Sequence, residues 1–182
     1  MRRHAVIMTS LALSLALTTL ATGCSQEKEK TSPEIPNQFC WSALEKKTVQ
    51  PLMPAGNKIS QDIKSFYFTD HVSRTRCKLH VDGRYAFGAH AKFPRFEEDV
   101  DWSWWEKYKP DPVRAGKKAI VWDTGATSYL PCKPLPGAGP STATRMELEI
   151  FVAGSGNRND RKALSHLIKQ FTAFAEKHLK CA

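Results

Sequence analysis

The sequence predicts an α+β domain in which short N-terminal helices and a long C-terminal helix cover a mostly antiparallel sheet. Residues 76–89 and 119–152 contain apolar runs that alternate with polar residues and are broken by Asp-Gly and Thr-Gly turns, which is typical of hairpins. Residues 160–179 instead repeat apolar side chains with helical spacing. Strands in the middle of the chain with helices at both ends indicate α+β architecture.

The domain begins with two short helical segments, expected within residues 40–44 and 48–53. Thr48 is a suitable N-cap, and Pro51 falls early enough to be accepted in a first turn. Residues 55–60 are expected to form a loop, and residues 65–69 (SFYFT) are expected to form a strand.

The clearest hairpin surrounds Asp82 and Gly83. A two-residue turn at these positions would pair Leu79 with Ala86, whereas a three-residue loop ending at Gly83 would pair Leu79 with Tyr85. Only the second register keeps one face apolar, because a slip of one residue inverts every side chain. We therefore favour the three-residue loop.

The later elements follow from the same patterns. Residues 119–122 and 126–130 predict a strand pair around Asp123-Thr124-Gly125, and residues 146–152 predict a half-buried strand. Residues 131–142 are expected to be a loop. The C-terminal helix can be capped by Asn159 or Asp160.

The first residues indicate export. Arg2 and Arg3 precede an apolar run from Ala5 to Leu20, which is followed by small residues. A short positive start, a short apolar core and small residues are typical of a signal peptide. We expect residues 1–23 to be this signal peptide.

The segment Leu20-Ala21-Thr22-Gly23-Cys24 resembles the lipobox of bacterial lipoproteins. This resemblance implies that Cys24 carries a diacylglyceryl lipid and anchors the protein to the extracytoplasmic face of the cell membrane. Ala21 stands where that family most often has Leu, and Ala21-Thr22-Gly23 also fits an ordinary signal peptidase, which would release the protein instead. Residues 24–38 are charged and contain proline, so we expect a flexible tether before a single domain over residues 39–182.

The chain has five cysteines, and Cys24 is the one beside the cleavage site. The other four form an even set suited to an oxidising compartment, which supports lipidation of Cys24. Of the three possible pairings we favour Cys40–Cys77 with Cys132–Cys181, each of which joins a helix to a strand. The nested pairing, Cys40–Cys181 with Cys77–Cys132, stays open.

Several motifs together resemble a family of uncharacterised actinobacterial lipoproteins with a domain of unknown function. They are the lipobox, the polar tether, the pattern Phe39-Cys40-Trp41-x-x-Leu44 with Val49-x-x-Leu52, the run from Arg76 to Gly83, and the terminal helix with Cys181. The resemblance implies an α+β envelope domain with two disulfides, and it implies no activity.

Aromatic residues gather in one short segment, at Trp102, Trp104, Trp105 and Tyr108. Acidic residues precede this segment and lysines follow it, which suits a helix. We expect the helix to pack rings on the sheet. The same four residues are the candidate surface for a glycan or peptide ligand.

Asp123-Thr124-Gly125 is similar to the motif of aspartic proteases, in which two aspartates share a proton. The chain has one copy, so a hairpin turn is the favoured interpretation. Asp70, His71 and Ser73 have the residue types of a catalytic triad, but neighbouring residues do not face one another. The histidines have no zinc spacing and no phosphate-binding glycine loop is present, so we expect no metal and no cofactor.

The chain carries 27 Lys and Arg against 18 Asp and Glu, a formal net charge of +9. The basic residues are spread along the sequence, which indicates a solvated surface with affinity for anionic lipid or wall polymers and no nucleic-acid partner. We expect a non-enzymatic envelope lipoprotein that binds a wall polymer, a peptide or a partner protein. The alternative is an envelope hydrolase that uses Asp123.

Overall fold

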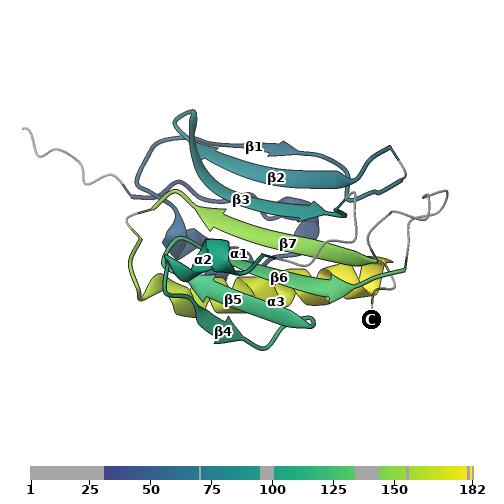
Figure 1. The fold of residues 1–182 in the computed structure, drawn as a ribbon. Coiled ribbons are helices and arrows are strands. Elements are labelled where there is room, and N and C mark those ends of the chain that lie inside the picture. The colour runs from purple at the N-terminus through teal and green to yellow at the C-terminus, as the bar shows by residue number, and fades with distance from the viewer. Residues whose placement is uncertain are drawn as a thin grey trace, which may run out of the picture.

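The computed structural model describes residues 31–69, 71–94, 101–133, 144–154, 156–179 and 181. The proposed signal peptide and Cys24 lie outside these residues, as do Asp70 and most of the expected loop 131–142. The described residues form one seven-stranded antiparallel sheet with a long C-terminal helix, which confirms the α+β class (Figure 1).

The strand order in the sheet is β1-β2-β3-β7-β6-β5-β4. The last strand in sequence therefore lies in the middle and joins the β2–β3 hairpin to the β5–β6 hairpin. The strands are β1 (Ile59–Ile63), β2 (Arg74–Val81), β3 (Arg84–Lys92), β4 (Asp111–Val113), β5 (Lys118–Trp122), β6 (Gly125–Pro131) and β7 (Arg145–Val152). The helices are η1 (Cys40–Ser42), α1 (Lys46–Val49), η2 (Gln50–Leu52), α2 (Ser103–Glu106) and α3 (Asp160–Leu179).

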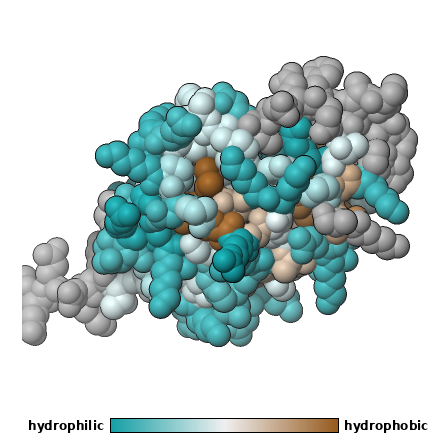
Figure 2. All heavy atoms as spheres, turned by 60° about the horizontal axis from the view of Figure 1, so that its bottom comes forward, coloured by the Kyte–Doolittle hydropathy of each residue, from teal (hydrophilic) through white to brown (hydrophobic). Residues whose placement is uncertain are grey.

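The two faces of the sheet differ. Helix α3 crosses one face, the inner face, and buries the apolar stripe that contains Leu164, Leu167 and Phe171 against it (Figure 1). Each such side chain contributes about 1.5–3 kcal/mol by leaving water. Helix α2 lies over the other face, the outer face, where most exposed strand residues are charged, polar or aromatic. With the lower edge of Figure 1 turned forward, the described surface is largely hydrophilic, with small apolar areas between polar side chains (Figure 2).

The β2–β3 hairpin corrects the predicted register. Asp82 and Gly83 have φ values of 50° and 77°, so they form a two-residue turn, and Val81 pairs with Arg84. A bulge next to Leu79 then shifts the ladder by one residue, and Leu79 pairs with Phe87. The prediction of a three-residue loop was wrong, because the bulge restores the single apolar face that the two-residue turn alone would break.

The first strand also differs from expectation. Residues 65–69 are irregular, and the strand at this edge of the sheet is β1, which begins inside the segment expected to be a loop. Four of the five β1 residues are exposed, so this strand has no apolar alternation to reveal it. Phe66 and Phe68 are packed without strand pairing, because their rings contact each other, Phe66 contacts Phe174, and Phe68 contacts Phe93.

The short N-terminal helical segments are confirmed, with different caps. Helix α1 begins at Lys46 after Glu45, so Thr48 lies inside it rather than at its N-cap. Pro51 occupies the first turn of η2, as expected. The strand pair β5–β6, strand β7 and helix α3 form where the sequence predicts them.

Both favoured disulfides are present. Cys40 is bonded to Cys77 of β2, and Cys132 at the end of β6 is bonded to Cys181 after α3. The first bond attaches the N-terminal segment to the sheet, and the second attaches the end of the long helix to it.

The segment before Phe39, expected to belong to the tether, contacts the domain from residue 31 onward. The amide of Ile35 donates a hydrogen bond to Gln50, and the Ile35 side chain is 1% exposed. The Gln50 side chain in turn donates to the carbonyl of Pro33. Within the described part of the chain, no helix has the length and apolar character needed to cross a membrane.

Candidate ligand-binding site

The four aromatic residues singled out in the sequence lie on or beside α2, on the outer face over β5 and β6. Trp105 stacks on Trp122 of β5 with 4.5 Å between ring centroids, and Trp102 contacts Tyr129 of β6 at 5.8 Å. These contacts are the packing of α2 on the sheet that the sequence predicts. Trp122 is the buried centre of the cluster and was not among the predicted candidates.

The other two aromatic residues remain at the surface. Trp104 is 60% exposed and Tyr108 is 40% exposed. The ammonium group of Lys107 lies 3.8 Å from the Trp104 ring centroid and 4.9 Å from that of Tyr108, within the range of cation–π attraction. We call Trp104, Lys107 and Tyr108 the platform.

A hollow of about 460 Å³ lies beside the platform. Its lining includes Tyr108, Trp122 and the turn at Asp123 and Thr124. Four basic residues and one acidic residue contribute to its lining, so the hollow carries an excess of positive charge. The basic residues are Lys107, Lys109, Arg158 and Arg161.

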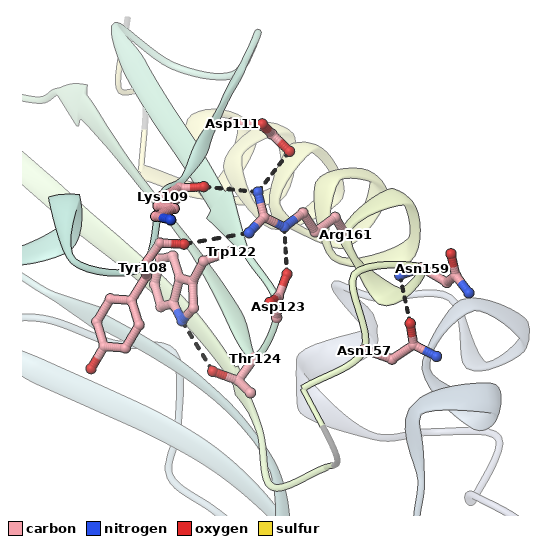
Figure 3. A network of polar contacts seen from close by, with 9 residues as sticks. All are labelled: Tyr108, Lys109, Asp111, Trp122, Asp123, Thr124, Asn157, Asn159 and Arg161. Atoms are coloured by element: carbon pink, nitrogen blue, oxygen red, sulfur yellow. Dashed lines mark hydrogen bonds and ion pairs between the residues drawn. The ribbon is translucent and has the colours of Figure 1, made fainter.

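Arg161, in the first turn of α3, is the most constrained of these side chains. Its Nε donates to Asp123 Oδ1 at 2.6 Å, and its Nη1 donates to Asp111 Oδ2 at 2.8 Å. Nη1 and Nη2 also donate to the carbonyls of Lys109 and Tyr108, at 2.9 and 3.4 Å. Figure 3 shows the guanidinium group between these four acceptors. The planar donor fork of arginine suits such an arrangement.

These contacts influence ionisation. The hydrogen bond from Arg161 holds the pKa of Asp111 below its ordinary value. The same hydrogen bond, together with that to Asp123, raises the pKa of Arg161. The network joins the start of α3 to the β5–β6 turn and to β4.

Each residue of the Asp-Thr-Gly motif has a structural contact. Asp123 accepts from Arg161, and Thr124 Oγ1 lies 3.2 Å from the indole nitrogen of Trp122, which donates to it. A Cβ on Gly125 would lie 2.6 Å from the Ile150 carbonyl oxygen and 2.6 Å from the Trp122 ring. The motif thus forms the hairpin turn that the sequence favours, at the wall of the hollow.

The remaining sequence candidates do not gather into a site. Asp70 lies outside the described residues, so the Asp70, His71 and Ser73 set cannot be placed as a group. Among the residues that the structure describes, no three His, Cys, Asp or Glu side chains are close enough to hold a metal ion. Arg158 and Arg161 could not be assigned to the hollow from sequence, since they lie about 40 residues from Trp122 and only the packing of α3 brings them there.

Comparisons with protein-family models, with curated proteins and with solved structures find no match for this chain.

Proposed function

We propose that this protein is an exported lipoprotein, anchored through Cys24, whose domain binds a ligand without catalysing a reaction. The observation that carries the binding role is the platform. The Trp104 ring is largely exposed, and Tyr108 stays 40% exposed although one face of its ring stacks on the buried Trp122. Aromatic residues exposed beside a hollow are typical of ligand recognition.

The charge around the platform defines the ligand class. Lys107, Lys109 and Arg158 make no ion pair with an acid among the described residues, and they flank the aromatic rings. A ligand with acidic groups and flat faces, such as an anionic wall glycan or an acidic peptide, complements this combination.

The geometry of Asp123 favours binding over the hydrolase alternative. A proton-sharing aspartate pair requires a second carboxylate facing the first. The Asp123 carboxylate instead faces the guanidinium of Arg161 at 2.6 Å.

Ligand binding is tested with the Trp104→Ala/Tyr108→Ala variant. We expect it to lose retention on the isolated wall fraction of the producing cell. Its unfolding midpoint should fall somewhat, because Tyr108 stacks on Trp122, so retention is compared at a temperature at which both proteins are folded. Tyr67→Ala is the matched control, since Tyr67 is 64% exposed and lies outside the platform. Unchanged retention of the double variant would reject the platform as the binding surface.

The anchor is tested by mass spectrometry of the mature N-terminus and by fractionation of Cys24→Ser. We expect a diacylated Cys24 in the wild type and release of the variant from the membrane. An unmodified Cys24 would reject the anchor and leave the platform test unaffected.

A further inference from the structure

A second hollow, of about 320 Å³, lies on the outer face over β2 and β3. Cross-strand pairing assembles it, because Arg74 lies opposite Lys92 and Arg76 lies opposite His90. The lining also includes Lys64, Lys78 and Glu149. We call it the basic hollow. None of its lining residues belongs to the hollow beside the platform.

Local ion pairs leave the positive charge of the basic hollow in excess. Arg76 pairs with Asp62 at 3.3 Å, and Lys92 pairs with Glu147 at 2.9 Å and approaches Glu149 at 3.8 Å. The other three cations make no ion pair with an acid in the described ranges. These are Lys64, Arg74 and Lys78.

His90 adds a second, independent observation. Its Nε2 atom is buried and has no hydrogen-bond partner in the part of the chain that the structure describes. Burial lowers the pKa of His90, and the nearby charges of Lys78, Arg76 and Lys92 lower it further. Burial also raises the pKa of Glu149, which lies directly opposite His90 on the neighbouring strand β7. Cations held close together carry a free-energy cost that a bound anion would reduce, and His90 responds to that cost because it lines the same hollow.

We propose that the basic hollow binds a phosphate group, either as a monoester or a diester. Arginine and lysine side chains are the usual protein ligands of phosphate oxygens, and the forked donors of Arg74 suit them. The charge of three cations without acidic partners is neutralised more completely by a phosphate dianion, or by several neighbouring phosphodiesters, than by a single carboxylate. This inference does not depend on the platform or on the lipid anchor.

The experiment uses the mature chain at low ionic strength, titrated with sodium phosphate and with glycerol 3-phosphate. We expect saturable binding by calorimetry and a saturable shift of the His90 ring signals in NMR spectra. The Arg74→Gln/Lys78→Gln variant is expected to bind at least about tenfold more weakly, because two charged donors are lost. The matched control is Lys162→Gln/Lys169→Gln, which removes the same charge from exposed positions on α3, across the sheet.

A second titration separates the sources of phosphate. Vesicles of phosphatidylcholine with phosphatidylglycerol present diester headgroups, and vesicles of phosphatidylcholine alone are the reference. If soluble phosphate binds and binding depends on Arg74 and Lys78, the ligand is a soluble phosphate compound. If only the anionic vesicles bind, with the same dependence on Arg74 and Lys78, the ligand is a lipid headgroup. Equal weakening by the two double variants, or no shift of His90 with either probe in the wild type, would overturn the proposal.

Discussion

Three consecutive residues near the N-terminus of the domain have positive φ values. Cys40, Trp41 and Ser42 have φ values of 43°, 61° and 57°. This conformation costs an L-residue about 1–2 kcal/mol. The disulfide of Cys40 and the hydrogen bond from the Trp41 indole to the Lys64 carbonyl, 2.6 Å long, hold the turn in place.

We predict that Ser42→Gly stabilises the protein by about 0.5–1 kcal/mol, because glycine accepts positive φ and the gain exceeds its greater freedom in the unfolded chain. The Ser42 side chain is exposed, so little contact is lost. Urea denaturation measures the change. Ala43→Gly, at φ −77°, is the control and should destabilise. A Ser42→Gly variant less stable than the wild type would contradict the claim that the positive φ of Ser42 is strained.

The glycine of the Asp-Thr-Gly turn is the second position where a single residue decides the local structure. We predict that Gly125→Ala destabilises by about 1–3 kcal/mol, because the new methyl group overlaps the Ile150 carbonyl and the Trp122 ring. Gly154→Ala is the control, since a Cβ there would meet nothing within 4 Å. Thermal unfolding of the two variants compares them. Equal midpoints would show that the strand yields to the methyl group.

His90 predicts a pH dependence of stability. Its pKa in the folded protein lies below the ordinary histidine value of about 6.5, so below about that pH the unfolded chain binds more protons than the folded one. Stability should therefore fall as the pH is lowered through this value, and it should level off below the folded pKa. Lys78 and Arg76 on β2 and Lys92 and Glu149 on the neighbouring strands face this group.

The measurement is the free energy of unfolding in urea between pH 5 and 8. His90→Gln should flatten the decrease on the acid side. His80→Gln, a histidine change on the same sheet face, is the matched comparison. A His90→Gln profile parallel to that of the wild type would refute the assignment.

At the scale of elements, the contact between α3 and the β4–β5–β6 edge has a polar and an apolar part. Phe171 and Leu164 supply burial on the inner face. The hydroxyl groups of Thr172 and Ser128 lie 3.1 Å apart in the same interface, and Arg161 supplies the four-acceptor network at the N-terminal end of the helix. The orientation of α3 also determines where Arg158 stands in the hollow beside the platform.

We predict that Arg161→Gln lowers the free energy of unfolding by about 1–2 kcal/mol. This decrease is smaller than the stability usually lost with several charged hydrogen bonds. The Asp111 and Asp123 side chains are 51% and 41% exposed, so water screens their interaction with Arg161. Arg158→Gln is the control and should change stability little, since Arg158 makes no ion pair with an acid among the described residues. Urea denaturation of both variants at pH 7 provides the comparison, and equal stabilities would mean that the network contributes nothing.

At the scale of the whole molecule, two disulfides close the fold around the sheet. Cys40–Cys77 spans 37 residues and Cys132–Cys181 spans 49. In the chain-entropy model each bond of this length stabilises by about 4 kcal/mol through the unfolded state. Because a domain of this size is stable by only about 5–15 kcal/mol, both bonds together account for a large share.

We predict that Cys132→Ser/Cys181→Ser lowers the free energy of unfolding by about 4 kcal/mol, and that reduction of the wild type lowers it further. Guanidinium denaturation with and without reductant measures both effects. A variant as stable as the wild type would show that helix packing alone holds the C-terminal end.

The sequence by itself determined the elements whose periodicity is long and regular. The apolar stripe from Leu164 to Leu179 predicted α3, and alternation predicted β7 and the β5–β6 pair. The even set of four cysteines, after Cys24 is set aside, predicted two disulfides, and the structure decided between the favoured and the nested pairing. Helical and strand periods are local properties, so a stretch of 7 to 20 residues is enough to reveal them.

Tertiary structure alone decided the edge strand, the hairpin register and the composition of both hollows. Strand β1 has almost no buried residue, so only pairing with β2 defines it. The two-residue turn by itself would put apolar side chains of β2 and β3 on opposite faces, and the bulge beside Leu79 returns them to one face. The basic hollow joins residues as far apart in sequence as Lys64 and Glu149, and the Arg161 network joins Tyr108 to Arg161, because β7 lies at the centre of the sheet and α3 crosses it. Such placements depend on the packing of distant elements, which a local pattern does not record.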